Sequence, residues 1–227
     1  MNTNDTNNKF NPQKLRSAYE SLFLPQPSLK SLIKSWENVV NFKCKNFKSP
    51  NKKGFRVKQN PYELARCLYF LHDKNINSYT EITKKSEGLF YLMSSFFSAI
   101  KGDHITGCCY DFRQHKNFDI YQKHNPWSSF VLLEKIDHFF LQYDSDLFMI
   151  DTPNTDLNKI KEIVNTIWNN GSTRFLLFHD IEDDRYNIRD YFKSLYLSQN
   201  GSYTCYRFYD EINDGPGLGL IEINKKQ

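Results

Sequence analysis

Residues 146–151 read Asp-Leu-Phe-Met-Ile-Asp, and residues 175–180 read Phe-Leu-Leu-Phe-His-Asp. Each stretch is a short apolar run that ends in a polar residue, which is typical of a strand buried on both faces of a parallel sheet. Between them, residues 156–168 carry apolar side chains at the spacing of one helical face. Two buried strands joined by a helix are the repeating unit of α/β proteins, so this stretch predicts an α/β fold.

The alternation of helices and strands continues on both sides of this stretch. A helix start is predicted at Asn60 and Pro61, because Asn is a favoured cap and Pro is favoured at the first helical position. The predicted strands are 78–82, 104–110, 129–133, 146–150, 173–178, 203–209 and 218–223, and the further predicted helices are one ending near residue 101, then 134–142, 156–168 and 187–197. No helix separates the last two strands, which predicts that they pair as an antiparallel edge. The predicted fold is a Rossmann-like, mostly parallel sheet with an antiparallel last strand and helices on both faces.

The first 60 residues do not share this alternation. Residues 1–12 are rich in Asn and Thr, which predicts a disordered tail. Two helices are predicted at 13–23 and 28–42, and the basic stretch 43–60 has no periodicity and predicts a loop. We therefore divide the chain into a tail at 1–12, an N-terminal helical extension at 13–45 and an α/β domain at 46–227.

Charge and composition argue against several classes of protein. The 30 basic and 26 acidic residues give a formal charge of +4, which is too balanced for a protein dedicated to nucleic acid binding. Hydrophobic residues make up only 39% of the chain, but the 16% that are aromatic bury much area each, so a packed core is expected. The longest apolar stretch, 89–100, is interrupted by serines and is too short to cross a bilayer, and no basic and apolar leader opens the sequence. We expect a cytoplasmic protein with no membrane partner.

Acidic residues stand at the predicted carboxyl ends of four strands. Glu81 lies near the end of the first strand, Asp111 follows the second, Asp151 follows the fourth, and the pair His179 and Asp180 follows the fifth. Ligands of open α/β sheets bind at this edge, so we expect these side chains to converge there. The alternative is that each is a solvated residue at the start of a loop, with His179 and Asp180 capping the segment that follows.

The two runs quoted above, with the helix between them, resemble class I S-adenosylmethionine-dependent methyltransferases. The resemblance is closest to the group related to cephalosporin-hydroxylase-like and sugar O-methyltransferases, whose fourth strand ends in Ile-Asp and whose fifth ends in His-Asp or Asp-Asp. The stretches Gln-Asn-Pro-Tyr-Glu-Leu at 59–64 and Tyr-Thr-Glu-Ile at 79–82 also resemble that group. The similarity spans roughly residues 56–224, so it implies a class I methyltransferase fold for most of the chain.

The resemblance implies a binding site for S-adenosylmethionine. In this family the first strand ends in an acidic residue followed by a glycine-rich turn, and an acidic residue after the second strand holds the ribose hydroxyls. Carried over by position, the cofactor-binding residues are Glu81, Thr83, Gly88 and Asp111. The glycine motif is eroded, because Thr83 stands where the family has its first glycine and Glu87 where it has another. A β-branched residue narrows the space for a ligand and does not easily take a positive φ.

Catalysis in such a site requires an in-line acceptor and removal of its proton. His179 is the candidate base, because an imidazole titrates near neutral pH. Asp151 and Asp180 are candidate ligands of a divalent cation such as magnesium, which would position and acidify an acceptor diol. The predicted catalytic group is therefore His179, Asp151 and Asp180, with the two carboxylates as the metal site.

The expected activity is S-adenosylmethionine-dependent O-methylation of a small polar acceptor such as a sugar. A catalytically degenerate methyltransferase-fold protein with a binding or structural role is the alternative, and the eroded glycine turn favours it. A methyltransferase that acts on nucleic acid is a third possibility, favoured only by the basic stretch 43–58; the Asn-Pro-Pro-Tyr-like motif of base methylation is missing. The sequence leaves open the acceptor, the metal dependence and whether the chain forms an oligomer.

Overall fold

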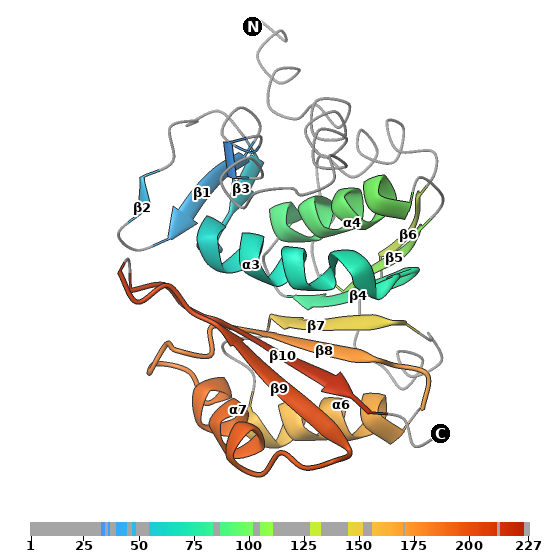
Figure 1. Ribbon diagram of the computed structural model, residues 1–227, viewed down its shortest axis with the longest axis vertical. Coiled ribbons are helices and arrows are strands. Elements are labelled where there is room, and N and C mark those ends of the chain that lie inside the picture. Colours follow the sequence, from blue (N-terminus) through green and yellow to red (C-terminus); the bar gives the residue numbers. More distant parts are fainter. Residues whose placement is uncertain are drawn as a thin grey trace, which may run out of the picture.

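A seven-stranded sheet with the order β6-β5-β4-β7-β8-β10-β9 forms the centre of the computed structural model (Figure 1). The structure describes residues 33–34, 36, 40–44, 47–48, 55–83, 87–101, 105–110, 128–132, 145–151, 156–169, 171–212 and 214–224. The strands are β4 (Ser78–Thr83), β5 (Ile105–Tyr110), β6 (Ser128–Leu132), β7 (Leu147–Asp151), β8 (Phe175–His179), β9 (Tyr203–Phe208) and β10 (Leu218–Ile223). The strands from β6 to β8 run parallel, and β10 runs antiparallel to both of its neighbours. The predicted α/β fold, with a mostly parallel sheet and an antiparallel last strand, is confirmed.

The last two strands pair antiparallel at one edge of the sheet, as predicted, but the reversed strand, β10, is the inner member of the pair and not the edge strand. β10 is inserted between β8 and β9, so that Leu220 faces Leu177 on one side and Tyr206 on the other. The first four residues of β10 are all buried, while β9 alternates between buried and partly exposed residues. A strand that is apolar along most of its length gains most from a central position, and an alternating strand tolerates the edge.

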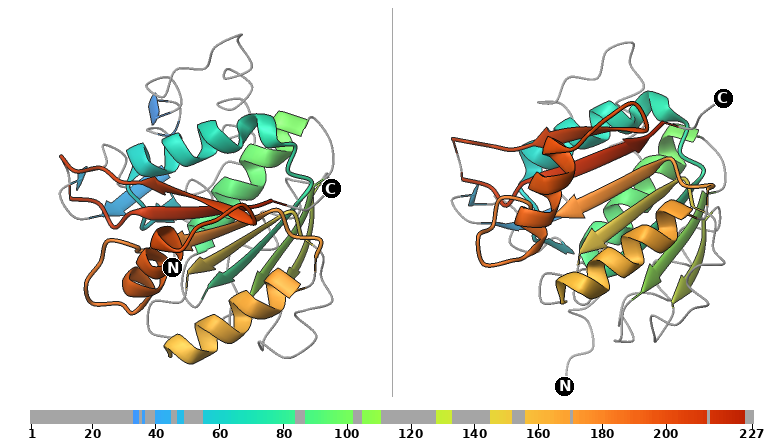
Figure 2. Two further views of the ribbon diagram at one scale, coloured as in Figure 1. Left: turned by 60° about the horizontal axis from the view of Figure 1, so that its bottom comes forward. Right: turned by 90° about the horizontal axis from the view of Figure 1, so that it is seen from below.

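Helices cover both faces of the sheet (Figures 1 and 2). They are α3 (Pro61–Leu71), α4 (Glu87–Lys101), α6 (Leu157–Asn169) and α7 (Ile188–Leu197), and a short 3-10 helix, His72–Lys74, follows α3. Alternate residues of β7 enter two separate hydrophobic clusters: Leu147 and Met149 pack with α3 and α4, and Phe148 and Ile150 pack with α6 and α7. This two-sided burial is the reason that the run is continuously apolar.

Three short strands precede α3, so the predictions for this region were partly wrong. β1 (Val40–Cys44) pairs antiparallel with β2 (Phe47–Lys48) and parallel with β3 (Phe55–Val57). Helical residues are described only up to Trp36, so the helix predicted through residue 42 ends earlier, and the predicted loop 43–60 contains two strands and part of a third. The rings of Trp36 and Phe42 lie 5.7 Å apart and join the core beside α4, so tertiary packing overrides the helical spacing.

Three further predictions concern residues that the structure does not describe. The tail at 1–12 and the helix at 13–23 lie outside the described residues, as does the helix at 134–142. The division at residues 12 and 45 stays a prediction. Among the helices that the structure describes, none is long and apolar enough to cross a membrane.

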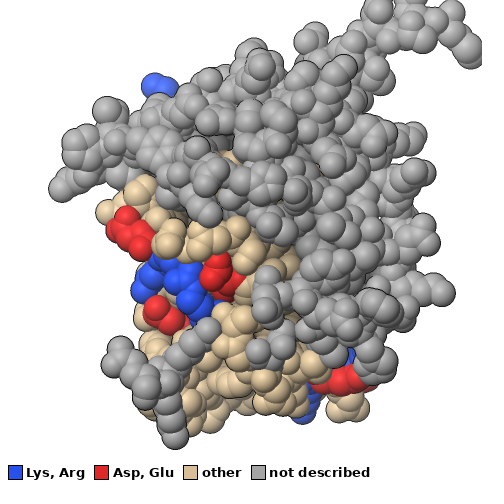
Figure 3. All heavy atoms as spheres, turned by 90° about the vertical axis from the view of Figure 1, so that its right-hand side faces the viewer, with Lys and Arg blue, Asp and Glu red and all other residues tan. Residues whose placement is uncertain are grey.

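The amino ends of the parallel strands are tied together by ion pairs. Charged side chains of both signs gather on the face shown in Figure 3, the side on which β10 ends. Asp146, just before β7, accepts hydrogen bonds from the Arg174 guanidinium (3.0 Å) and from the Asn77 and Ser78 backbone N–H groups (2.7 and 3.2 Å). Lys74 pairs with Glu222 near the end of β10, at 2.9 Å. These contacts join the sheet at the amino ends of its parallel strands. Ligands of open α/β sheets bind at the opposite, carboxyl ends.

Candidate active site

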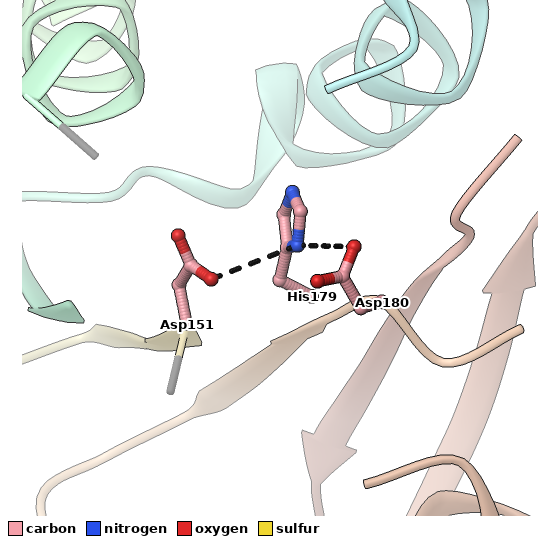
Figure 4. Close-up of side chains that lie close together, drawn as sticks. All are labelled: Asp151, His179 and Asp180. Atoms are coloured by element: carbon pink, nitrogen blue, oxygen red, sulfur yellow. Dashed lines mark ion pairs between the residues drawn. The ribbon is translucent and has the colours of Figure 1, made fainter. Parts of the chain in front are cut away.

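Three polar side chains lie together at the carboxyl ends of β7 and β8 (Figure 4). Asp151 is the last residue of β7, His179 is the last residue of β8, and Asp180 follows directly. The two strands pair in parallel with Ile150 opposite Phe178, so their ends meet at one point. His179 Nδ1 lies 2.8 Å from Asp180 Oδ1 and 3.7 Å from Asp151 Oδ1. The structure therefore brings together the three residues that the sequence predicted as the catalytic group.

The backbone at Asp180 directs its carboxylate toward the imidazole. Asp180 has a φ of +59°, a left-handed conformation that Asp adopts more readily than most residues. Within the described residues no backbone N–H donates to its carboxylate, and the carboxylate instead forms the ion pair with His179. Among the described residues, the Asp180 carboxylate therefore does not cap the segment that follows it.

Burial and charge set the protonation of this group. The side chains of His179, Asp151 and Asp180 are only 6%, 12% and 15% exposed. Burial raises the pKa of Asp151, and the nearby imidazole partly opposes this shift. Burial also disfavours a charged imidazole, but the Asp180 and Asp151 carboxylates outweigh it and raise the pKa of His179 to about 9. At neutral pH His179 is therefore an imidazolium, and it becomes a base only when the negative charge beside it is reduced.

The donor atoms of the group suit a divalent cation. One ligand atom from each of Asp151, His179 and Asp180 lies within 4.8 Å of the other two. Carboxylate oxygens and imidazole nitrogen are ordinary ligands of divalent metals. In the part of the chain that the structure describes, neither carboxylate is paired with a lysine or arginine, and both face Nδ1 of His179. The group therefore fits a cation held between the two strand ends.

Thr83 belongs to this cluster. It is the last residue of β4, lies opposite Asp151 in the parallel ladder and is buried. Its hydroxyl donates to Asp151 Oδ2 at 3.4 Å. Where the resembled family has a glycine that opens space, this chain thus has a side chain bonded to the candidate catalytic group.

The other predicted cofactor residues are placed differently. Glu81 is fully buried, and its carboxylate accepts a hydrogen bond of 2.7 Å from the Tyr79 hydroxyl. Gly88, in the first turn of α4, packs on β3, where an added Cβ would lie 1.9 Å from the carbonyl oxygen of Arg56. Its lack of a side chain is thus required by helix packing. Asp111 and the turn residues 84–86 lie outside the described residues. Among the predicted cofactor residues that the structure describes, Glu81 is a buried acid near the end of β4, and Gly88 does not form an open glycine turn.

A further buried carboxylate was not predicted to have a role in the site. Glu63 lies in the first turn of α3, at the helix start predicted from Asn60 and Pro61. That start is confirmed, because Asn60 Oδ1 accepts from the N–H groups of Tyr62 and Glu63. The Glu63 carboxylate contacts the connection between β9 and β10. Burial raises the pKa of Glu63 to about 7, and His179 is among the charges that act on it. The only sequence signal was its place in the stretch 59–64.

Comparison with known proteins agrees with the topology. No family model matches the chain, and no curated protein matches it. Among solved structures, cofactor-bound Rv0187 from MTB gives a TM-score of 0.51 at 9% identity and covers 96% of this chain and 100% of that one. The delta-N METTL16 MTase domain gives a TM-score of 0.50 at 10% identity and covers 95% of this chain and 98% of that one. At such identities the likeness concerns the fold, and we conclude that this chain has the Rossmann-like fold of class I methyltransferases.

Proposed function

We propose that the chain is an S-adenosylmethionine-dependent O-methyltransferase that acts on a small polar acceptor, such as a sugar, in the cytoplasm. The observation that carries this proposal is the group of Asp151, His179 and Asp180 at the carboxyl edge of a sheet with the fold of methyltransferases. The quoted motifs, which resemble the cephalosporin-hydroxylase-like and sugar O-methyltransferase group, favour a hydroxyl acceptor.

In this proposal Glu81, Thr83 and Asp111 are assigned to the cofactor side of the site, and Gly88, which the resemblance also assigns there, serves the packing of α4 on β3. S-adenosylmethionine supplies a methyl group bound to a positively charged sulfur, which an oxygen nucleophile attacks in line. The chain then needs to exclude water, orient the acceptor and remove one proton from it. Little other chemistry is required of the protein.

His179 is proposed to remove that proton at Nε2. In Figure 4 the Nδ1 atom faces both carboxylates and the other ring nitrogen points away from them. Asp180 holds the ring orientation through Nδ1 and stabilises the imidazolium that forms, as a carboxylate does in a nucleophile–histidine–carboxylate triad. When Asp151 and Asp180 are engaged by positive charge other than the imidazolium, the pKa of His179 falls back toward its ordinary value and the ring is ready to accept a proton.

Asp151 and Asp180 are proposed to hold a divalent cation such as magnesium. A bound divalent cation would lower the pKa of coordinated acceptor hydroxyls and stabilise the developing alkoxide. A vicinal diol, as in a sugar, offers two oxygens to such a site. The proposal therefore assigns the two carboxylates to acceptor positioning and the imidazole to proton transfer.

The decisive experiment is a calorimetric titration of the purified chain with S-adenosylmethionine and S-adenosylhomocysteine. We expect both to bind, and we expect transfer of a labelled methyl group to a member of a panel of sugars, with transfer dependent on Mg²⁺. The absence of binding at millimolar cofactor would overturn the proposal.

A degenerate protein with a binding role is the second candidate. The observation that favours it is Thr83, which is buried and bonded to Asp151 at the position of the family's first glycine. Such a protein would keep the fold and the acidic group without using the cofactor. Binding of Mn²⁺ in the absence of any cofactor binding would identify this case.

A further inference from the structure

The buried carboxylate of Glu63 lies at the centre of a network that joins three segments. It accepts hydrogen bonds from the Gln59 side-chain amide (2.6 Å), from the backbone N–H of Asp210 (3.1 Å) and from the backbone N–H of Gly217 (3.1 and 3.2 Å to its two oxygens). Asp210 and Gly217 stand near the two ends of the connection between β9 and β10. One side chain of α3 thus fixes both ends of this loop.

The loop is shaped to admit this carboxylate. A Cβ at Gly215 would lie 2.1 Å from Glu63 Oε1, so no larger residue fits without a shift. The neighbouring Asn60 amide donates to the Asp210 carboxylate at 3.1 Å, and the Arg66 guanidinium donates to the carbonyl of Tyr209 at 3.1 Å. The start of α3 and the loop therefore form one bonded unit, with Glu63 at its buried centre.

A single peptide group connects Glu63 to the site. The peptide between Pro216 and Gly217 donates its N–H to Glu63, and its carbonyl accepts the N–H of Glu182 at 2.9 Å. The next carbonyl, that of Gly217, accepts the N–H of Ile181 at 3.4 Å. Ile181 and Glu182 are the two residues that follow Asp180. Because a peptide group is planar and stiff, fixing its N–H also fixes the direction of its carbonyl.

We propose that Glu63 is a positioning residue of the site, which holds the Pro216–Gly217 peptide and, through it, the turn that presents Asp180 to His179. The left-handed backbone of Asp180 has to be maintained by its surroundings. The two hydrogen bonds to the Pro216 and Gly217 carbonyls anchor the turn to the loop, and the Asp183 N–H closes the turn by donating to the Asp180 carbonyl at 3.3 Å. The catalytic part of this inference rests on the proposed function, while the structural part can be tested without it.

The structural test is amide hydrogen exchange in the Glu63→Gln variant of the full chain at pH 8.5, where Glu63 is ionised. The variant keeps the shape of the side chain but places an NH₂ group where an acceptor oxygen was. We expect the Ile181 and Glu182 amides to exchange about ten- to a hundredfold faster, since hydrogen bonds to a charged acceptor are lost, while amides of the β4–β7 ladder keep their rates. Unchanged exchange at these two amides would overturn the inference.

Two further variants complete the exchange experiment, one as a negative control and one as an independent test of the same contact. Glu222→Gln removes a carboxylate that is bonded to Lys74 and Tyr206 at the far edge of the sheet, so it should leave the Ile181 and Glu182 amides unaffected. Gly215→Ala approaches the same contact from the loop and leaves every charge in place. It should produce the same local acceleration as Glu63→Gln, and it provides the answer if the Glu63 variant does not fold.

The catalytic part of the inference is tested by the kinetics of methyl transfer. We expect Glu63→Gln to lower kcat at least tenfold with the KM for S-adenosylmethionine unchanged, and to weaken Mn²⁺ binding to the Asp151, His179 and Asp180 group by a similar factor. A local change in exchange with unaltered kcat and Mn²⁺ affinity would overturn the positioning role. A wild-type chain that transfers no methyl group contradicts the proposed function alone, and the exchange experiment still decides on Glu63.

Discussion

At the scale of single residues, His179 is the group most changed by its surroundings. Its ring is buried, yet the carboxylates of Asp180 and Asp151 keep the proton on it above neutral pH. The same pair of carboxylates that suits a cation therefore also stabilises an imidazolium. Competition between a proton and a cation for one acidic group links the two proposed roles of the site.

Replacing Asp180 with Asn should release this proton. With the nearer carboxylate gone, burial is opposed by the more distant Asp151 and Glu63 carboxylates, and we expect the pKa of His179 to fall by about one unit or more. An NMR titration of the imidazole measures this shift. The Asp184→Asn variant removes a charge from an exposed position in the following loop and should leave the titration unchanged. An unaltered His179 pKa in Asp180→Asn would contradict the assigned electrostatics.

The proposed chemistry makes a separate prediction for Asp151 and His179. Asp151→Asn and His179→Ala should each reduce methyl transfer by about 10²–10⁴-fold, the range expected for loss of general base catalysis or of its support. Affinity for S-adenosylhomocysteine should stay within a few fold, because these residues are assigned to the acceptor side. Labelled methyl transfer and calorimetric titration measure the two quantities. A parallel loss of cofactor affinity would instead place the residues in the cofactor site.

At the scale of elements, the close approach of α4 to β3 depends on Gly88. A Cβ at this position would meet the carbonyl oxygen of Arg56, a backbone atom that cannot rotate away. We expect Gly88→Ala to lower the free energy of unfolding by about 1–3 kcal/mol, as overpacking does in a dense core. Urea denaturation measures the change.

Gly201→Ala is the matched control for this packing argument. Nothing lies within 4 Å of a Cβ built at Gly201, and its backbone is not left-handed. The control should change stability by no more than about 0.5 kcal/mol. Equal effects of the two substitutions would show that α4 does not depend on the missing side chain of Gly88.

At the scale of the whole molecule, two buried groups predict how stability depends on pH. Burial raises the pKa of Glu63 from 4.5 to about 7, and the Asp180 and Asp151 carboxylates, acting against burial, raise that of His179 from 6.5 to about 9. Both groups bind their protons more tightly in the folded chain. The stability that each proton confers is complete below the unfolded pKa and is lost as the pH rises through the folded pKa.

We therefore expect the free energy of unfolding to fall between pH 4.5 and pH 9, by on the order of 3 kcal/mol for each group. Urea denaturation at pH 5, 7 and 9 measures this decline. Glu63→Gln should flatten the part below pH 7 and change the part above it less, because Glu63 contributes least of the three carboxylates to the raised pKa of His179. A stability that rises with pH across this window would show that neither group is held as described.

The sequence alone determined the elements whose signal is local. The apolar runs that became β7 and β8 are recognisable because both faces of a central strand are buried, and the cap at Asn60 is recognisable because it satisfies neighbouring N–H groups. The meeting of Asp151 with His179 and Asp180 also followed from the sequence, since carboxyl ends of adjacent parallel strands share an edge.

Tertiary structure alone decided the features whose partners are distant along the chain. β1 is a strand because its side chains join the core beside α4, and β10 lies between β8 and β9 because it is apolar along most of its length. Glu63 contacts Asp210 and Gly217, which lie 147 and 154 positions further along the chain. No local sequence pattern distinguishes Glu63 from an ordinary residue at the start of a helix. Its environment is created only when α3 packs against the β9–β10 loop, because burial and the donors that compensate for it are properties of the assembled fold.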